Sequence, residues 1–127
     1  MKLNAECIRD ILFTVEDCTS LENTLKIDPT NLPEDLAKYA PDVLLYHVKQ
    51  CELSDLFANV DWYLNGSCRI YYLSPEGHKF ISNVRSDNAW SKTKDIAGKI
   101  GANSIDILKE IGSSVITALI QGYLGTP

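Results

Sequence analysis

The residues able to do chemistry are few, and His47 and Cys51 are the first pair to consider. They stand four positions apart, so on a helix they share one face and could form half of a zinc site. Zinc takes four ligands, however, and neither a Cys-x-x-Cys pair nor a second histidine lies nearby in the sequence. We therefore interpret the pair as a buried histidine beside a buried cysteine, and we expect no metal and no cofactor.

Cys7 is the other reactive candidate, as a nucleophile. It falls in the first turn of a predicted helix, where the helix dipole is expected to lower the pKa of its thiol. No base is indicated beside it, and the chain has only two histidines. The sequence also lacks a Gly-rich phosphate loop and a carboxylate pair with catalytic spacing. We predict a core role for Cys7 and a protein that is not an enzyme.

The first half of the chain is predicted to be mainly helical. Asn4 is a suitable cap for a helix that ends near residues 17–20. Its inward positions follow the spacing of one helical face: Ile8, Ile11, Leu12 and Val15. A short strand around Leu25 and Ile27 leads into a turn at residues 28–31.

Two further helices are expected before the chain changes its period. Asn31 stands three residues before Glu34, which resembles a capping box for a short helix ending at Lys38. Pro41 suits the first turn of the next helix, Asp42–Leu53.

The clearest local signal is a β-hairpin. Residues 57–64 and 68–73 are rich in aromatic and β-branched residues, and Asn65-Gly66 lies between them. Asn-Gly is typical of a tight turn in which both residues adopt positive φ.

The last third is again predicted to be helical. Ser74 and Pro75 open a helix. Residues 86–88 break or kink the helical pattern, which continues to Gly101, and a final helix begins at Asn103 or Ser104 and runs to about Leu124. The predicted inward positions of the first two segments are Gly77, Phe80, Ile81, Val84, Trp90, Thr93, Ala97 and Ile100.

This order of elements predicts an α+β fold of the winged-helix kind, with three helices, a hairpin as the wing, and C-terminal helices. In that plan 42–53 is the recognition helix and 62–69 forms the wing. We expect a winged-helix-like domain at residues 1–86 and a helical extension at 87–127, packed as a single structural unit.

Blocks of residues along most of the chain resemble a domain-of-unknown-function family of small phage and prophage proteins. They are Met1–Asn4 with Cys7–Leu12, then Tyr46–Val48, Leu73–Phe80, Trp90–Lys94 and Ser104–Leu108. The resemblance implies a winged-helix fold and a phage setting, with no established activity. One departure stands out, because Asp55 occupies the place of a glycine that usually ends the third helix.

The charge is divided unevenly along the chain. Residues 1–61 hold 12 acidic and 5 basic residues, whereas residues 62–127 hold 5 acidic and 7 basic ones. Proteins that bind duplex DNA normally present a basic face, because neutralising phosphates supplies much of their affinity. The balance therefore disfavours a strong nucleic-acid binder.

Three surfaces are candidates for contact. The third helix and the wing would present a partner-binding set, with Arg69 among its aromatic residues: Leu45, Tyr46, Lys49, Gln50, Trp62, Tyr63 and Arg69. A possible anion-facing set, for which a solvated helix face is the alternative, is Arg85, Lys92, Lys94 and Lys99. The last helix is apolar on more than one side, which favours self-association through Ile111, Val115, Ile116, Leu119 and Ile120.

These observations predict a binding protein. We expect a phage-associated accessory protein that acts through protein contact as a homo-oligomer, with counter-defence inhibition as one form. A winged-helix DNA-binding transcriptional regulator is the alternative. A polar start and four cysteines without paired spacing predict a cytoplasmic protein with free thiols. A membrane span is not expected, since the uncharged run from Ile111 holds only 17 residues.

Overall fold

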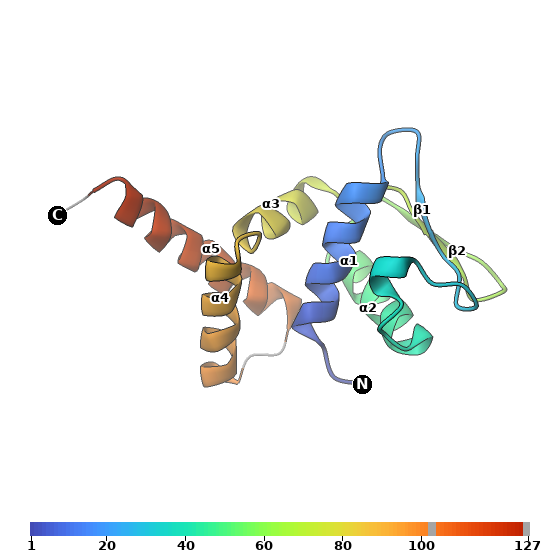
Figure 1. Ribbon diagram of the computed structural model, residues 1–127, viewed down its shortest axis with the longest axis horizontal. Helices are drawn as coiled ribbons and strands as arrows, with labels where there is room; N and C mark the ends of the chain where they lie inside the picture. Colours follow the sequence, from blue (N-terminus) through green and yellow to red (C-terminus); the bar gives the residue numbers. More distant parts are fainter. Residues whose placement is uncertain (102–103, 126–127) are drawn as a thin grey trace. The chain divides into compact units, whose positions relative to one another are not determined.

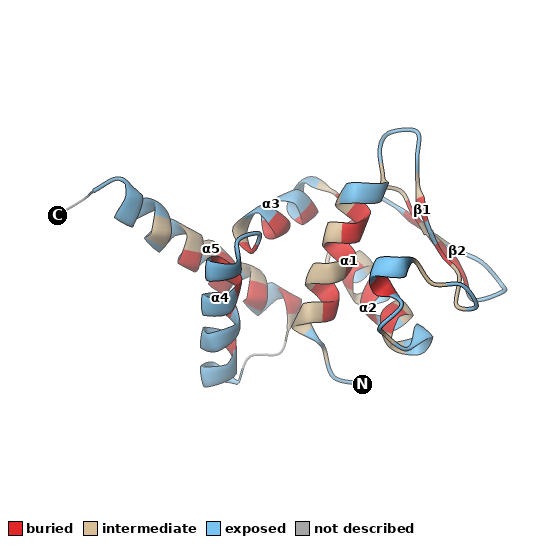
Figure 2. Cartoon of the chain, in the orientation of Figure 1, coloured by how far each residue is buried: buried red, intermediate tan, exposed pale blue. Residues whose placement is uncertain are grey.

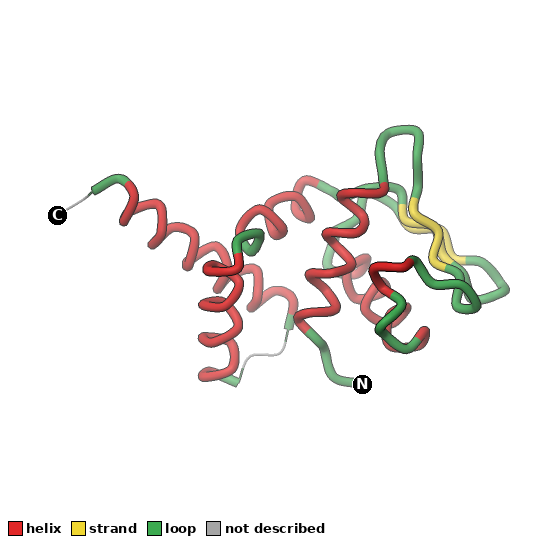
Figure 3. The backbone as a smooth tube through the Cα atoms, in the orientation of Figure 1, coloured by secondary structure: helices red, strands yellow, loops and turns green. Residues whose placement is uncertain are grey.

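A computed structural model describes residues 1–101 and 104–125 (Figure 1). It contains helices together with a small antiparallel sheet, which confirms the predicted α+β class (Figure 3). The chain forms two compact units, residues 1–78 and 79–127. The predicted boundary after residue 86 lies further along the chain and stays a prediction.

The first unit begins with helix α1 (Ala5–Cys18), and Asn4 caps it as predicted. The Asn4 Oδ1 accepts the backbone N–H groups of Glu6, at 3.0 Å, and Cys7, at 3.3 Å, two donors that have no partner inside the helix. The predicted inward residues Ile8, Ile11, Leu12 and Val15 are all completely buried.

Strand β1 (Leu25–Ile27) follows, and the predicted turn is closed by the Asn31 N–H donating to the Asp28 carbonyl at 3.0 Å. The predicted capping box is wrong. The next element is a 3-10 helix, η1 (Glu34–Leu36), whose N-cap residue is Pro33, and no side chain caps it. Asn31 instead belongs to the turn, where it forms a bridge with Asp28.

Helix α2 (Pro41–Leu53) has Pro41 in its first turn and buries Leu44, Val48 and Cys51. It ends in a Schellman motif, in which the Leu56 N–H donates to the Cys51 carbonyl and the Asp55 N–H to the Glu52 carbonyl, both at 3.0 Å. Asp55 has φ 60°, the left-handed conformation that this position requires. The aspartate therefore adopts the left-handed conformation that a glycine usually adopts at this position.

The predicted hairpin is confirmed, with strands β2 (Val60–Trp62) and β3 (Cys68–Ile70) shorter than the β-prone runs. β3 is the central strand of the sheet, in the order β1-β3-β2. The prediction of a tight two-residue turn is wrong. A hydrogen bond between the Tyr63 N–H and the Ser67 carbonyl closes a three-residue loop, in which only Gly66 has positive φ.

Helix α3 (Pro75–Asn83) starts as predicted, because the Ser74 Oγ accepts the Gly77 N–H at 3.0 Å. Gly77 packs against the end of α2, and a Cβ at this position would lie 2.1 Å from the Leu56 carbonyl oxygen. Only glycine allows so close an approach. The boundary between the two units falls inside α3.

In the second unit the helical pattern is interrupted at the predicted place, between α3 and the next helix. Ser86 caps helix α4 (Asp87–Ile100) by accepting the Ala89 N–H at 3.1 Å. Ser104 caps helix α5 (Ile105–Tyr123), while the alternative start at Asn103 lies outside the described residues. Buried positions in α5 extend from Ile105 only to Val115 (Figure 2). In the parts of the chain that the structure describes, no helix has the length and apolar character to cross a membrane.

The winged-helix comparison stays a prediction. The observed order of elements has a three-residue 3-10 helix at the place of that plan's second helix.

Candidate functional site

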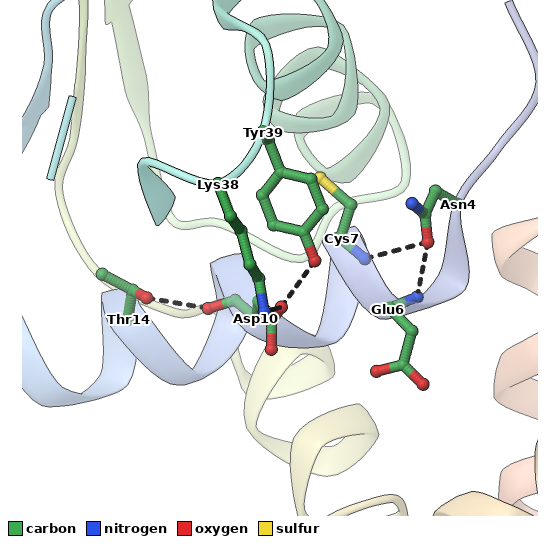
Figure 4. A network of polar contacts seen from close by, with 7 residues as sticks. All are labelled: Asn4, Glu6, Cys7, Asp10, Thr14, Lys38 and Tyr39. Carbon is green, nitrogen blue, oxygen red and sulfur yellow. Dashed lines mark hydrogen bonds and ion pairs between the residues drawn. The ribbon is translucent and has the colours of Figure 1, made fainter. Parts of the chain in front are cut away.

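The polar contacts of α1 form a structural network (Figure 4). The Asp10 carboxylate accepts the Tyr39 hydroxyl at 2.5 Å and pairs with the Lys38 Nζ at 2.9 Å. The Thr14 hydroxyl donates to the Asp10 carbonyl at 2.8 Å. Burial and the Asp10 carboxylate both raise the pKa of Tyr39, so this hydroxyl stays protonated and holds η1 and the residues after it to α1.

His47 is also a structural residue. Its Nε2 accepts the Asn4 backbone N–H at 2.8 Å, and its Nδ1 lies 2.7 Å from the Val43 carbonyl oxygen. An N–H can only donate and a carbonyl can only accept, so these two contacts require the neutral ring with its proton on Nδ1. Both ring nitrogens are thus occupied. Among residues 1–101 and 104–125, no three His, Cys, Asp or Glu side chains gather closely enough to hold a metal ion.

The cysteines are free thiols, and three of the four are buried. The expectation that the helix dipole lowers the pKa of Cys7 is wrong, because burial and the nearby Asp10 raise that pKa to about 12. Burial likewise raises the pKa of Cys68 to about 12 and that of Cys51 still further. These thiols remain protonated and behave as apolar core residues.

The surface formed by α2 and the β2–β3 hairpin, here called the α2–hairpin surface, brings together part of the predicted partner-binding set. Glu52 is at its centre, since its Oε1 accepts the Lys49 Nζ at 2.9 Å and the Trp62 Nε1 at 3.0 Å. The Lys49 ammonium also lies 5.2 Å from the centre of the Trp62 ring. Lys49 therefore has a carboxylate and an aromatic face as partners, which offset its charge.

The hairpin and the end of α2 also carry exposed aromatic and leucine side chains. Trp62 is 38% exposed and Tyr63 42%, and Leu64 at the hairpin tip is fully exposed. Leu53, in the last turn of α2, is 66% exposed. Of the other predicted residues on α2, Tyr46 is exposed whereas Leu45 and Gln50 are half-buried.

Arg69 is directed away from the Glu52, Lys49 and Trp62 contacts. It pairs with Asp61 on β2 and with Lys26 on β1, so it points to the face of the sheet opposite Trp62, whose strand partner is Cys68. Its guanidinium donates to the Thr24 hydroxyl at 3.3 Å. Arg69 is thus separated from Trp62, because neighbouring positions of a strand alternate between faces. By the same alternation Tyr63 and Tyr71 lie on the Arg69 side, where the Tyr71 hydroxyl donates to the Asp61 carboxylate at 2.7 Å. The predicted grouping of Arg69 with these aromatic residues stays a prediction.

The predicted anion-facing residues are spread over several surroundings. Lys99 forms an ion pair with Asp95 at 3.0 Å, and Lys94 lies 5.5 Å from the centre of the Trp90 ring. Lys92 lines a groove between α4 and α5, and Arg85 is exposed in the loop between α3 and α4. The four residues thus have different neighbours, and their anion-facing role stays a prediction.

The α4–α5 groove is the second candidate site, with a volume of about 700 Å³. Its walls are mostly aliphatic and carry a few charges: Lys92, Asp95, Ile96, Ile100, Ile107, Glu110, Ile111, Ser114, Val115, Ala118 and Leu119. Of the predicted oligomerisation residues, Ile111, Val115 and Leu119 line this groove, Ile116 is half-buried and Ile120 is 52% exposed.

Two parts of these sites were missed in the sequence. Glu52 stands three residues after Lys49, which was a readable signal for a helix pair, but its contact with Trp62 depends on the hairpin. Ile100 was expected to be buried and is 62% exposed. It forms, with Ile96 four residues earlier, a second apolar face of α4 beside the buried one.

The structure thus defines a small α+β protein with an acid-centred aromatic surface in one unit and an apolar groove in the other. Residues 2–103 match the model of a family described as hypothetical protein (DUF2513), a domain of unknown function. The chain belongs to this family, as the resemblance in its residue blocks predicted. No curated protein and no solved structure matches it.

Proposed function

We propose that this protein is a non-enzymatic binding module that contacts another protein through the α2–hairpin surface. The observation that carries the proposal is the position of Glu52, which holds both Lys49 and Trp62. Lys49 is the only lysine or arginine of α2, and its partner neutralises it. A surface with exposed aromatic and leucine side chains and no surplus of positive charge suits a protein partner better than a phosphate backbone.

The charge of the first unit supports a partner with a basic contact surface. Residues 1–78 contain 13 acidic and 6 basic residues, a balance of −7. Asp42 and Asp55, at the two ends of α2, are both exposed. Complementary charge speeds the encounter of two proteins and disfavours partners of the same sign. The proposed partner is therefore a cationic protein surface with an apolar site for the hairpin tip.

Our proposal sets this contact in a phage-borne accessory protein of the cytoplasm, and inhibition of a host defence system is one concrete form of it. The residue blocks that resemble the phage and prophage family support the setting. The free thiols are those expected in a reducing compartment.

The alternative is a winged-helix regulator that reads DNA with α2. The order of α2 and the following hairpin supports this alternative. Against it, each phosphate contact requires a positive group, and α2 supplies only a lysine that Glu52 already holds. A regulator would bind a duplex with an affinity that falls steeply as salt rises.

Affinity capture from a nuclease-treated bacterial lysate tests the proposal. The baits are the full chain, a Tyr63→Ala/Leu64→Ala variant of the hairpin tip, and a Leu21→Ala control at an exposed leucine elsewhere in the first unit. We expect the wild type and the control to retain one protein in fixed ratio to the bait, released by salt, and the tip variant to lose it. Equal capture by the tip variant, or no capture by the wild type, would contradict the proposal.

A further inference from the structure

We infer that the α4–α5 groove is a self-association site that takes a second copy of this chain, with α4 of one copy lying on α5 of the other. The inference goes beyond the proposed function, since the groove belongs to the second unit and shares no residue with the α2–hairpin surface. Three observations carry it: the exposed isoleucines, the opposite charges of Lys92 and Glu110 on the two walls, and the absence of buried residues at the end of α5.

The groove exposes aliphatic side chains that a folded chain normally covers. Ile96 is 39% exposed, Ile100 62% and Ile107 38%, and all three line the groove. Scattered exposed leucines or isoleucines are common, but a contiguous apolar hollow with a charged rim is typical of an interaction site. The walls therefore need an apolar occupant with matching charges at its edges.

The charges on the rim match a second copy. Lys92 stands on the α4 wall and Glu110 on the α5 wall, and neither forms an ion pair with another of the residues that the structure describes. Asp95, the other charged residue of the lining, is paired with Lys99. A two-fold axis along the groove lays the α4 wall of each copy on the α5 wall of the other. We expect this arrangement to bring Lys92 of each copy to Glu110 of its mate, so that the pair forms twice, as a self-complementary interface requires.

The end of α5 supplies the additional length that such an interface needs. No charged residue follows Glu110 in α5, and no residue after Val115 in this helix is buried. Leu119 continues the groove wall, and Ile120 is 52% exposed. A stable interface takes about 800 Å² from each partner, more than a small groove offers alone. We expect the second copy to cover the groove together with the end of α5.

Light scattering during size exclusion gives the first test. The wild type should have twice the 14.2 kDa mass of one chain at high protein concentration. Ile100→Glu, at an exposed position of the groove rim, should elute as a single chain with unchanged circular dichroism. The control Leu21→Glu, at an exposed leucine of the first unit, should keep the double mass. A single-chain mass for the wild type, or a double mass for a folded Ile100→Glu variant, would overturn the inference.

Charge reversal decides whether the occupant is a second copy in this arrangement. Lys92→Glu and Glu110→Lys should each weaken association at least tenfold, because each puts like charges opposite one another across the two-fold axis. An equimolar mixture of the two variants should restore it, since each variant then meets its complement in both positions. Co-purification of the two variants, each carrying a different tag, measures their association directly. If the mixture associates no better than the separate variants, the proposed arrangement is wrong. This result is independent of the hairpin-tip experiment, so the two proposals fail separately.

Discussion

Asp55 is a single residue whose backbone conformation destabilises the fold. It occupies the left-handed position of the Schellman motif, with φ 60°, where a side chain is disfavoured and glycine is not. Its carboxylate also lies beyond the C-terminus of α2, the negative end of the helix dipole.

Asp55→Gly is therefore expected to raise the free energy of unfolding by about 1 kcal/mol. Chemical denaturation monitored by circular dichroism measures the change. Asp55→Asn is the matched control, because it removes the charge and keeps a residue that accepts positive φ. The explanation fails if glycine gives no more stability than asparagine.

His47 links the start of α1 to α2 by two hydrogen bonds, to Asn4 and Val43. His47→Leu leaves the Asn4 N–H without its acceptor, so we expect it to lower the free energy of unfolding by about 1–3 kcal/mol. Tyr46→Phe, at the exposed neighbour, should change it by less than about 0.5 kcal/mol. Similar unfolding midpoints for the two variants would contradict the role of His47.

At the scale of elements, Gly77 determines how α3 meets the end of α2. Gly77→Ala would place a Cβ 2.1 Å from the Leu56 carbonyl, so something in the backbone must shift. We expect a loss of about 3 kcal/mol in the free energy of unfolding. Gly98→Ala is the control, because a Cβ there meets no atom within 4 Å and the position is inside α4, where alanine stabilises by about 0.5–1 kcal/mol. Opposite signs for the two changes are the expected result.

Most helices and the hairpin could be predicted from the sequence. Local signals were sufficient for the caps at Asn4 and Ser74, for the interruption at residues 86–88 and for the hairpin, because each depends on residues close together in the chain. The failures have physical causes too. Asn31 was expected to cap a helix, but it forms the bridge that closes the turn before Pro33.

The candidate sites were predicted less well than the elements. Trp62 and Lys49 were assigned to one surface, but the Glu52 carboxylate that joins them was missed. Glu52 and Trp62 are ten residues apart, so only the folded hairpin brings them into contact. Arg69 and Trp62 were placed in one set, but the register of β3 puts them on opposite faces of the sheet. The groove depends on how α4 and α5 pack, and no local pattern distinguishes the exposed Ile100 from the buried Ala97.

At the scale of the whole molecule, the buried thiols predict how stability depends on pH. The unperturbed thiol pKa is 9.0, and folding raises the pKa of Cys7 and of Cys68 to about 12. A raised pKa means that the unfolded chain loses its protons first. Stability is thus fully present below about pH 9 and is lost as pH rises toward 12.

Each such thiol should lower the free energy of unfolding by about 1.4 kcal/mol per pH unit in that window. Denaturation curves at pH 8 and pH 11 measure the fall, and the exposed Cys18 serves as control, since Cys18→Ser should leave it unchanged. Equal stability at the two pH values would show that the thiols are not protected.

The most direct test of the central claim is photo-crosslinking in living bacteria from a benzophenone amino acid placed at Leu64, the exposed tip of the hairpin. The account predicts a discrete adduct that protease destroys and nuclease leaves intact, and that is absent when the probe replaces Leu21. An adduct that nuclease removes would mean that this surface contacts nucleic acid, and the protein-binding account would be wrong.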